Sequence, residues 1–135
     1  LRFMQVNINA QRDPVFEKSN SDETSVSSKA KLVVKLSSCA KDVQSSREGT
    51  YKLSRDIVNG KSYWMQEMGN SAIWFDKTNS NWKIGTKTGL GGSTSGLYSN
   101  ANVDEPQDAT IWNYYIIEND TWIESNETEV YAGKY

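Results

Sequence analysis

Histidine is absent from this chain of 135 residues, and cysteine occurs only once, as Cys39. The lack of histidine excludes Ser-His-Asp and Cys-His nucleophile pairs, histidine-ligated zinc, and general acid–base catalysis by imidazole. A single cysteine excludes cysteine-clustered zinc, iron–sulfur clusters and a disulfide within the chain. At Cys39 we expect a buried apolar thiol, or a disulfide to another chain if the protein is extracellular.

Long apolar runs and a strong charge excess are also missing. No hydrophobic stretch approaches the roughly 18 residues that suggest a membrane-spanning helix. The net charge is −2, from 17 acidic and 15 basic residues, which gives no reason to expect nucleic acid as a partner. We therefore expect no membrane span and no nucleic-acid partner, and we expect other protein subunits or glycans instead.

Aromatic residues are few at the N-terminus and frequent after it. Residues 1–49 contain only Phe3 and Phe16, whereas all five tryptophans and all seven tyrosines follow. Large rings dominate the energetics of small cores, so the second part is expected to hold the main core. The sequence accordingly divides into an N-terminal extension, residues 1–48, and a Trp-rich β module, residues 49–135.

The chain opens with an alternating apolar pattern. Met4, Val6 and Ile8 are separated by polar residues, which predicts a strand over residues 3–9 with one apolar face. An unpaired apolar strand is a liability, so this one must pair with some sheet edge. The chain's own module could supply that edge, or a neighbouring subunit could supply it by strand exchange, which would make the protein a homo-oligomer.

The rest of the extension is less uniform. The polar run over residues 17–29 predicts an exposed linker. Residues 30–43 fit both a strand that ends near Leu36 and a short helix, because their apolar residues also recur at spacings of four, three and four. The paired valines Val33 and Val34 favour the strand.

From Gly49 onward the pattern is that of short strands. Apolar and aromatic runs of four to seven residues alternate with turn signals about every ten residues. The strongest turn signal is Asn59-Gly60, which favours a two-residue hairpin turn with positive φ. These features predict an all-β fold: an antiparallel meander, small sandwich or barrel, with an N-terminal strand-bearing extension.

Residues 49–135 contain a series of aromatic and turn motifs: Gly49-Thr50-Tyr51, Val58-Asn59-Gly60-Lys61, Tyr63-Trp64, Ile73-Trp74-Phe75, Trp82-Lys83-Ile84-Gly85, Gly96-Leu97-Tyr98-Ser99, Pro106, Trp112-Asn113-Tyr114-Tyr115 and Trp122. The order of these motifs resembles that of a small Trp-rich β module. This module recurs, often in tandem, in multidomain and often extracellular proteins of aquatic invertebrates and protists. The resemblance implies a module without enzymatic activity. It also implies a Cys immediately before the proline, where this chain has Glu105 instead.

The tryptophans allow two interpretations. Some rings could lie exposed on one face and stack on sugar rings, or the rings could form the core. We expect Trp74 and Trp112 in the core, because apolar residues flank both. The candidate ligand-binding residues are Trp64, Trp82, Tyr98 and Trp122.

Other motifs indicate loops rather than sites. The Gly-rich segment over residues 89–96 lacks the Gly-Lys-Ser/Thr ending of a phosphate-binding loop, so a hairpin connection is expected. Asp104, Glu105 and Asp108 do not match the spacing of an EF-hand, and we expect solvated loop charges. The carboxylates show no convergent motif, so we expect no catalytic residue, metal or cofactor.

Two N-glycosylation sequons begin at Asn119 and Asn126. A chain with this content of Asn, Ser and Thr has about two by chance, so the sequons alone decide nothing. The combined pattern favours a non-enzymatic extracellular module with a structural or adhesive role, possible assembly through the N-terminal strand, and a cytoplasmic location as the alternative. The competing function is a lectin-like carbohydrate-binding domain that uses exposed Trp and Tyr rings.

Overall fold

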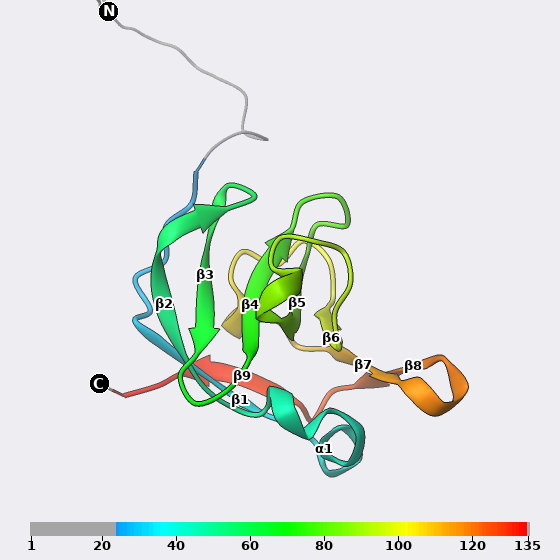
Figure 1. Ribbon diagram of the computed structural model, residues 1–135. Coiled ribbons are helices and arrows are strands. Elements are labelled where there is room, and N and C mark those ends of the chain that lie inside the picture. Colours follow the sequence, from blue (N-terminus) through cyan, green and yellow to red (C-terminus); the bar gives the residue numbers. More distant parts are fainter. Residues whose placement is uncertain (1–23, 135) are drawn as a thin grey trace, which may run out of the picture.

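The computed structural model describes residues 24–134, which form one curled antiparallel sheet of nine strands (Figure 1). The order of strands across the sheet is β8-β7-β6-β5-β4-β3-β2-β1-β9, so consecutive strands lie side by side from β1 to β8. This confirms the predicted all-β antiparallel meander. The predicted strand over residues 3–9, with Met4, Val6 and Ile8, lies outside the described residues.

The elements are, in chain order, β1 (Lys31–Lys35), α1 (Ser38–Gln44), η1 (Ser45–Arg47), β2 (Gly49–Val58), β3 (Lys61–Gln66), β4 (Ser71–Asp76), β5 (Asn81–Thr86), η2 (Lys87–Gly89), β6 (Leu97–Ser99), η3 (Pro106–Asp108), β7 (Trp112–Ile116), η4 (Ile117–Asn119), β8 (Thr121–Ser125) and β9 (Glu129–Ala132). The η elements are single turns of 3-10 helix.

The ambiguous segment forms a strand and then a helix. Strand β1 alternates between buried Leu32 and Val34 and more exposed residues, and it pairs with both β2 and β9. The Ser37 hydroxyl then accepts a hydrogen bond from the backbone N–H of Ala40, 3.3 Å away, and so caps the start of α1. Part of the predicted N-terminal extension is thus an internal strand of the sheet.

The sheet curls because its two edge strands are consecutive in the chain. Only residues 126–128 separate β8 from β9, yet β8 pairs with β7 and β9 pairs with β1. The bend is held by hydroxyl groups. Thr128 accepts a hydrogen bond from the backbone N–H of Ser37 at 3.1 Å, and Ser125 accepts one from the backbone N–H of Thr128 at 3.2 Å. The opposite ends of the meander are therefore joined at one point.

The main core fills the inside of the curl. Trp64, Trp82 and Trp112 are buried there together with aliphatic residues from β1, β4, β5 and β6. The rings of Trp64 and Trp82 meet edge to face, with centroids 6.0 Å apart. Helix α1 contributes the buried Ala40 to this core.

A second, smaller cluster lies on the outer face of β3 and β4. Trp74 is fully buried there beside Tyr63 and Ala72. The Gly-rich segment folds over it: the Trp74 indole N–H donates to the carbonyl of Gly92 at 2.9 Å. A Cβ at Gly85 would lie 2.9 Å from the Trp74 ring, so this position requires glycine. The prediction that Trp74 and Trp112 are core residues is confirmed, on opposite faces of the sheet.

The turn at Asn59-Gly60 agrees with its prediction, whereas the predicted burial of Cys39 is wrong. Asn59 and Gly60 have φ values of 54° and 82° at the tip of the β2–β3 hairpin, as a two-residue turn of this kind requires. Cys39, expected to be a buried thiol, is exposed. The reason is that Cys39 lies in α1, where its neighbour Ala40 turns toward the core instead.

Candidate functional site

Three aromatic rings gather on the outer face of the last strands. Tyr98 comes from β6, Tyr115 from β7 and Trp122 from β8, and we refer to them as the aromatic patch. Their position follows from the alternation of side chains along a strand. In β7, Trp112 and Tyr114 are buried, so Tyr115 faces outward beside its cross-strand partner Trp122.

The rings of the aromatic patch touch but do not lie in one plane. The centroids of Tyr98 and Trp122 are 4.7 Å apart with planes inclined at 62°, and those of Tyr115 and Trp122 are 5.1 Å apart at 46°. The Trp122 side chain remains 40% exposed. The patch is thus a ridge of tilted rings with one open tryptophan, rather than a flat platform.

An ion pair lies beneath one side of the patch. The ammonium group of Lys83 lies 4.8 Å from the ring centroid of Tyr98 and 3.4 Å from Asp76 Oδ2, and both charged side chains are almost fully buried. Burial opposes ionisation of Asp76, but hydrogen bonds from Asn79 and the charge of Lys83 outweigh it, and the pKa of Asp76 is lowered. Tyr98 is therefore held by a fixed cation under its ring.

The other side of the patch is fixed by a turn residue. The Tyr115 hydroxyl donates to Asp120 Oδ1 at 2.7 Å, and this hydrogen bond to the carboxylate raises the pKa of Tyr115. Asp120 has a φ of 50° at the end of η4, where the β7–β8 hairpin turns. The hairpin turn and the ring orientation are thus coupled.

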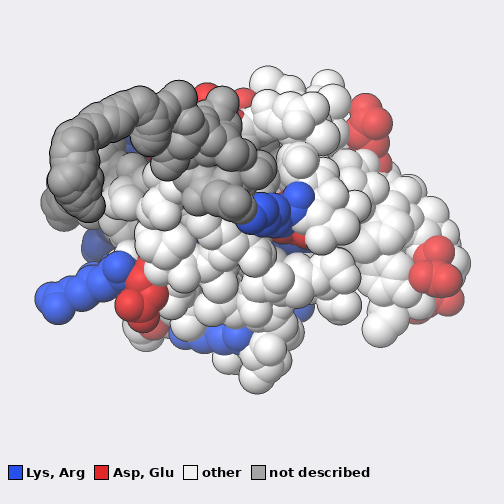
Figure 2. All heavy atoms as spheres, turned by 90° about the horizontal axis from the view of Figure 1, so that it is seen from above, with Lys and Arg blue, Asp and Glu red and all other residues white. Residues whose placement is uncertain are grey.

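The segment that carries Tyr115 and Trp122 has charged residues of one sign only. Residues 111–133 contain no Lys or Arg, and Figure 2 shows acidic and no basic side chains at the right-hand end, where the β7–β8 hairpin projects in Figure 1. A basic ligand would be attracted to this surface and an acidic one repelled. The acidic residues of the segment are Glu118, Asp120, Glu124, Glu127 and Glu129.

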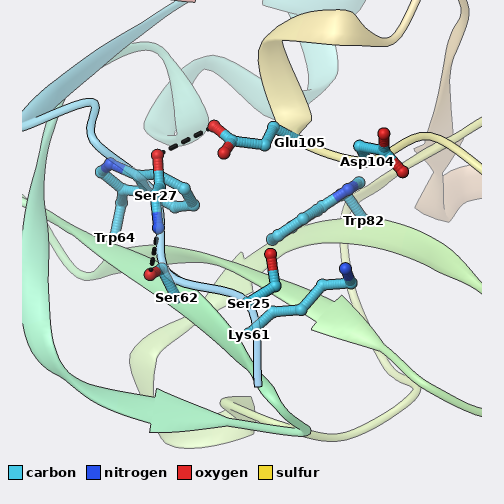
Figure 3. Close-up of a pocket in the computed structure, with 8 residues that line it drawn as sticks. All are labelled: Ser25, Ser27, Lys61, Ser62, Trp64, Trp82, Asp104 and Glu105. Atoms are coloured by element: carbon cyan, nitrogen blue, oxygen red, sulfur yellow. Dashed lines mark hydrogen bonds between the residues drawn. The ribbon is translucent and has the colours of Figure 1, made fainter. Parts of the chain in front are cut away.

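A hollow between β3, β5 and the segment before β1, shown in Figure 3, is a packing junction rather than a binding site. Its polar groups already bond to one another: the Ser27 hydroxyl donates to Glu105 Oε1 at 2.8 Å, and the Ser27 N–H donates to the Ser62 hydroxyl at 2.9 Å. These contacts tie the segment before β1 to β3 and to the loop before η3. The hollow is lined by Ser25, Ser27, Lys61, Ser62, Trp64, Trp82, Asp104 and Glu105.

The structure separates the four candidate ligand-binding residues into two pairs. Trp64 and Trp82 are at most 1% exposed, and their indole N–H groups donate to the carbonyls of Lys29 and Val103. Tyr98 and Trp122 lie together on the aromatic patch. Sequence reasoning did not select Tyr115, although its place next to Tyr114 already required the two rings to face opposite sides.

The remaining candidates are not members of the aromatic patch. Asn119 and Asn126, the sequon asparagines, are exposed. Within residues 24–134, no group of three or more acidic or sulfur-bearing side chains could hold a metal ion. In the same part of the chain, no helix has the length and apolar character to cross a membrane.

Comparison of this chain with known proteins gives no match, whether to a family model, to the curated proteins or to the solved structures.

Proposed function

We propose that this chain is a non-enzymatic, extracellular interaction module with a structural or adhesive role, and that the aromatic patch is its contact surface. The observation that carries the proposal is the exposed Trp122 ring, packed against Tyr98 and Tyr115 on a projecting hairpin. Tryptophan and tyrosine are enriched among the residues that dominate binding energy at protein interfaces. The other four tryptophans are buried and serve the core.

Selection from a displayed peptide library tests this proposal. The full chain is immobilised and compared with two variants, Trp122→Ala in the patch and Tyr131→Ala on β9, a second exposed ring outside it. We expect enriched peptides with the full chain and with Tyr131→Ala, and loss of the same peptides with Trp122→Ala. Enrichment that survives Trp122→Ala would show that the patch is not the contact surface.

Carbohydrate binding is the second candidate, because the open face of Trp122 is available for stacking on a sugar ring. The inclination of 62° between Tyr98 and Trp122 allows a sugar to stack on one ring but not across both. A glycan array separates the two functions. If the full chain binds a glycan and Trp122→Ala does not, carbohydrate binding is supported. If the full chain binds no glycan on the array, carbohydrate binding is rejected.

Assembly through the N-terminal strand remains part of the proposal. It rests on the alternation of Met4, Val6 and Ile8 and on the need of such a strand for a sheet edge. The proposed extracellular location is compatible with exposed sequon residues Asn119 and Asn126, and a cytoplasmic location is its alternative. Mass measurement of the protein purified from its native source would detect glycans at these positions.

A further inference from the structure

Strand β8 has one edge that pairs with no other strand among the described residues. It lies at the end of the sheet, and its only partner there is β7. The direction of its free backbone groups follows from the ladder. Because the N–H of Tyr115 donates toward Gly96 on the β6 side, its neighbours Tyr114 and Ile116 direct their backbone groups to β8.

The alternation continues across β8. Ile123 pairs with Tyr114 and Thr121 pairs with Ile116, so both residues of β8 direct their N–H and C=O groups to β7. Trp122 and Glu124 therefore direct theirs away from β7, at the free edge. An extended chain laid along this edge would meet two residues that can each exchange a pair of backbone hydrogen bonds.

The two faces beside this edge differ in chemistry. On the outer face lie the exposed Trp122 ring and the Glu124 carboxylate. On the inner face an open hollow lies beside the edge, lined by Cys39, Tyr114 and Ile123 together with polar and acidic residues, among them Ser125 and Glu127. Side chains of an added strand alternate between these faces, so one set would meet an aromatic and acidic surface and the other a hollow lined in part by Tyr114 and Ile123.

The charge of the edge argues against a second copy as the occupant. Two β8 edges placed side by side would bring Glu118, Asp120 and Glu124 of one copy near the same residues of the other, and like charges across a strand pair destabilise it. A strand with basic side chains would instead be attracted to these carboxylates. An arginine beside Trp122 can stack on the ring and pair with a carboxylate.

We propose that the free edge of β8 binds an extended peptide segment of a protein partner, added antiparallel, in which apolar residues alternate with basic ones. The apolar residues enter the hollow beside Ile123, and the basic residues lie over Trp122 and Glu124. This proposal rests on the proposed interaction function and specifies its partner. Backbone hydrogen bonds supply the affinity, and the alternating side chains supply the selectivity.

A designed peptide tests the backbone part of the proposal. The probe is the acetylated and amidated heptapeptide Thr-Arg-Val-Arg-Val-Arg-Thr, titrated into the full chain by calorimetry. In an antiparallel pair, the residues opposite Trp122 and Glu124 are the arginines, and their N–H groups face β8. Methylation of the arginine backbone nitrogens should therefore weaken binding at least tenfold, while methylation of the valine nitrogens should leave it within about twofold.

Two pairs of protein variants test the side-chain part. Trp122→Ala and Glu124→Lys should each weaken binding of the probe at least fivefold. Their controls, Tyr131→Ala and Glu129→Lys, change an exposed ring and an exposed acid on β9 and should leave the affinity unchanged. Replacing the arginines of the probe with glutamates should abolish binding.

Several outcomes would overturn the proposal. Absence of binding, equal effects of the two methylated probes, or equal binding of the glutamate probe would each do so. If methylation has no effect but Trp122→Ala still removes ligands selected from the library, the proposed function holds and the strand addition is wrong. If the full chain self-associates in sedimentation runs and Glu124→Lys strengthens this by removing like charges from the paired edges, a second copy occupies the edge.

Discussion

At the scale of single residues, two buried tryptophans differ in one hydrogen bond. Both Trp64 and Trp112 are fully buried in the main core, but the Trp64 indole N–H donates to the Lys29 carbonyl at 2.8 Å, whereas that of Trp112 has no hydrogen-bond partner among residues 24–134. Replacement by phenylalanine removes the N–H and much of one ring in both cases. Loss of the hydrogen bond to the Lys29 carbonyl adds a further cost at Trp64 only.

We therefore expect Trp64→Phe to destabilise the fold by about 1 kcal/mol more than Trp112→Phe. Trp112→Ala, which removes the whole ring, should cost about 3–5 kcal/mol. Urea unfolding of the variants measures these differences. Equal free energies of unfolding for the two phenylalanine variants would contradict the role given to the Lys29 contact.

The tip of the β2–β3 hairpin gives a backbone prediction. Gly60 has a φ of 82°, which β-branched residues resist, so Gly60→Val should lower the free energy of unfolding by on the order of 1 kcal/mol or more. Gly60→Asn is the matched control, because asparagine tolerates positive φ. A melting temperature that is the same for valine and asparagine at this position would reject the assignment.

The buried ion pair beneath the aromatic patch predicts a pH dependence. The pKa of Asp76 is lowered in the folded protein, so its ionised form stabilises the fold above the pKa of an unfolded aspartate, and this contribution is lost as pH falls through the lowered value. Asp76→Asn leaves the buried Lys83 without its carboxylate and should cost about 3 kcal/mol near neutral pH.

The cost of Asp76→Asn should shrink as the pH is lowered, because the wild-type carboxyl then becomes neutral too. Free energies of unfolding at several pH values test this. The exposed Asp104 supplies the control, since Asp104→Asn should change stability little at any pH. A cost of Asp76→Asn that stays constant down to strongly acidic pH would contradict the sign of the pKa shift.

At the scale of elements, the bend between β8 and β9 determines how the sheet closes. Thr128 is buried, and its hydroxyl accepts a hydrogen bond from the Ser37 N–H at the start of α1. Thr128→Val keeps the shape of the side chain but leaves that N–H without its acceptor. We expect a loss of about 1–2 kcal/mol, measured by thermal unfolding.

Thr121→Val is the control for this prediction. The Thr121 hydroxyl donates a hydrogen bond to the backbone carbonyl of Asn119, but this contact is exposed to solvent and water can replace it. This variant should cost much less than Thr128→Val. If Thr128→Val and Thr121→Val lower the stability of the fold equally, the hydroxyl contacts of Thr128 do not hold the bend.

At the scale of the whole molecule, the proposed assembly gives a prediction about residues 1–12. If the strand predicted over residues 3–9 completes the sheet of a neighbouring subunit, deletion of residues 1–12 should give a folded monomer. Sedimentation velocity at several concentrations measures the change. A full chain that is already monomeric at high concentration, or an assembly that survives the deletion, would refute strand exchange.

Some features of this protein were determined by local sequence alone. Alternation at period two and the spacing of turn signals determine the strands from β2 to β8, and Asn59-Gly60 determines its hairpin turn. Apolar neighbours were enough to place Trp74 and Trp112 in a core. In each case the decisive interactions lie within a few residues along the chain, so a local pattern contains them.

Other features were decided only by contacts between distant parts of the chain. Strand β1 lies between β2 and β9. Because β9 follows β1 by about a hundred residues in the sequence, no local pattern encodes the pairing of these two strands. Residues 30–43 carried strand and helix patterns together, and the Ser37 cap and the neighbouring strands decided where one ends and the other begins.

The aromatic patch has the same origin. The sequence indicates Tyr98 and Trp122 as candidate binding residues. Their contact with Tyr115 depends on the register that pairs β6, β7 and β8, which no local pattern gives. The sequence equally cannot separate buried Trp64 and Trp82 from exposed Trp122, because all three occur in similar strand runs. Alternation determines that neighbouring side chains face opposite sides, and only the curl of the sheet decides which side is enclosed.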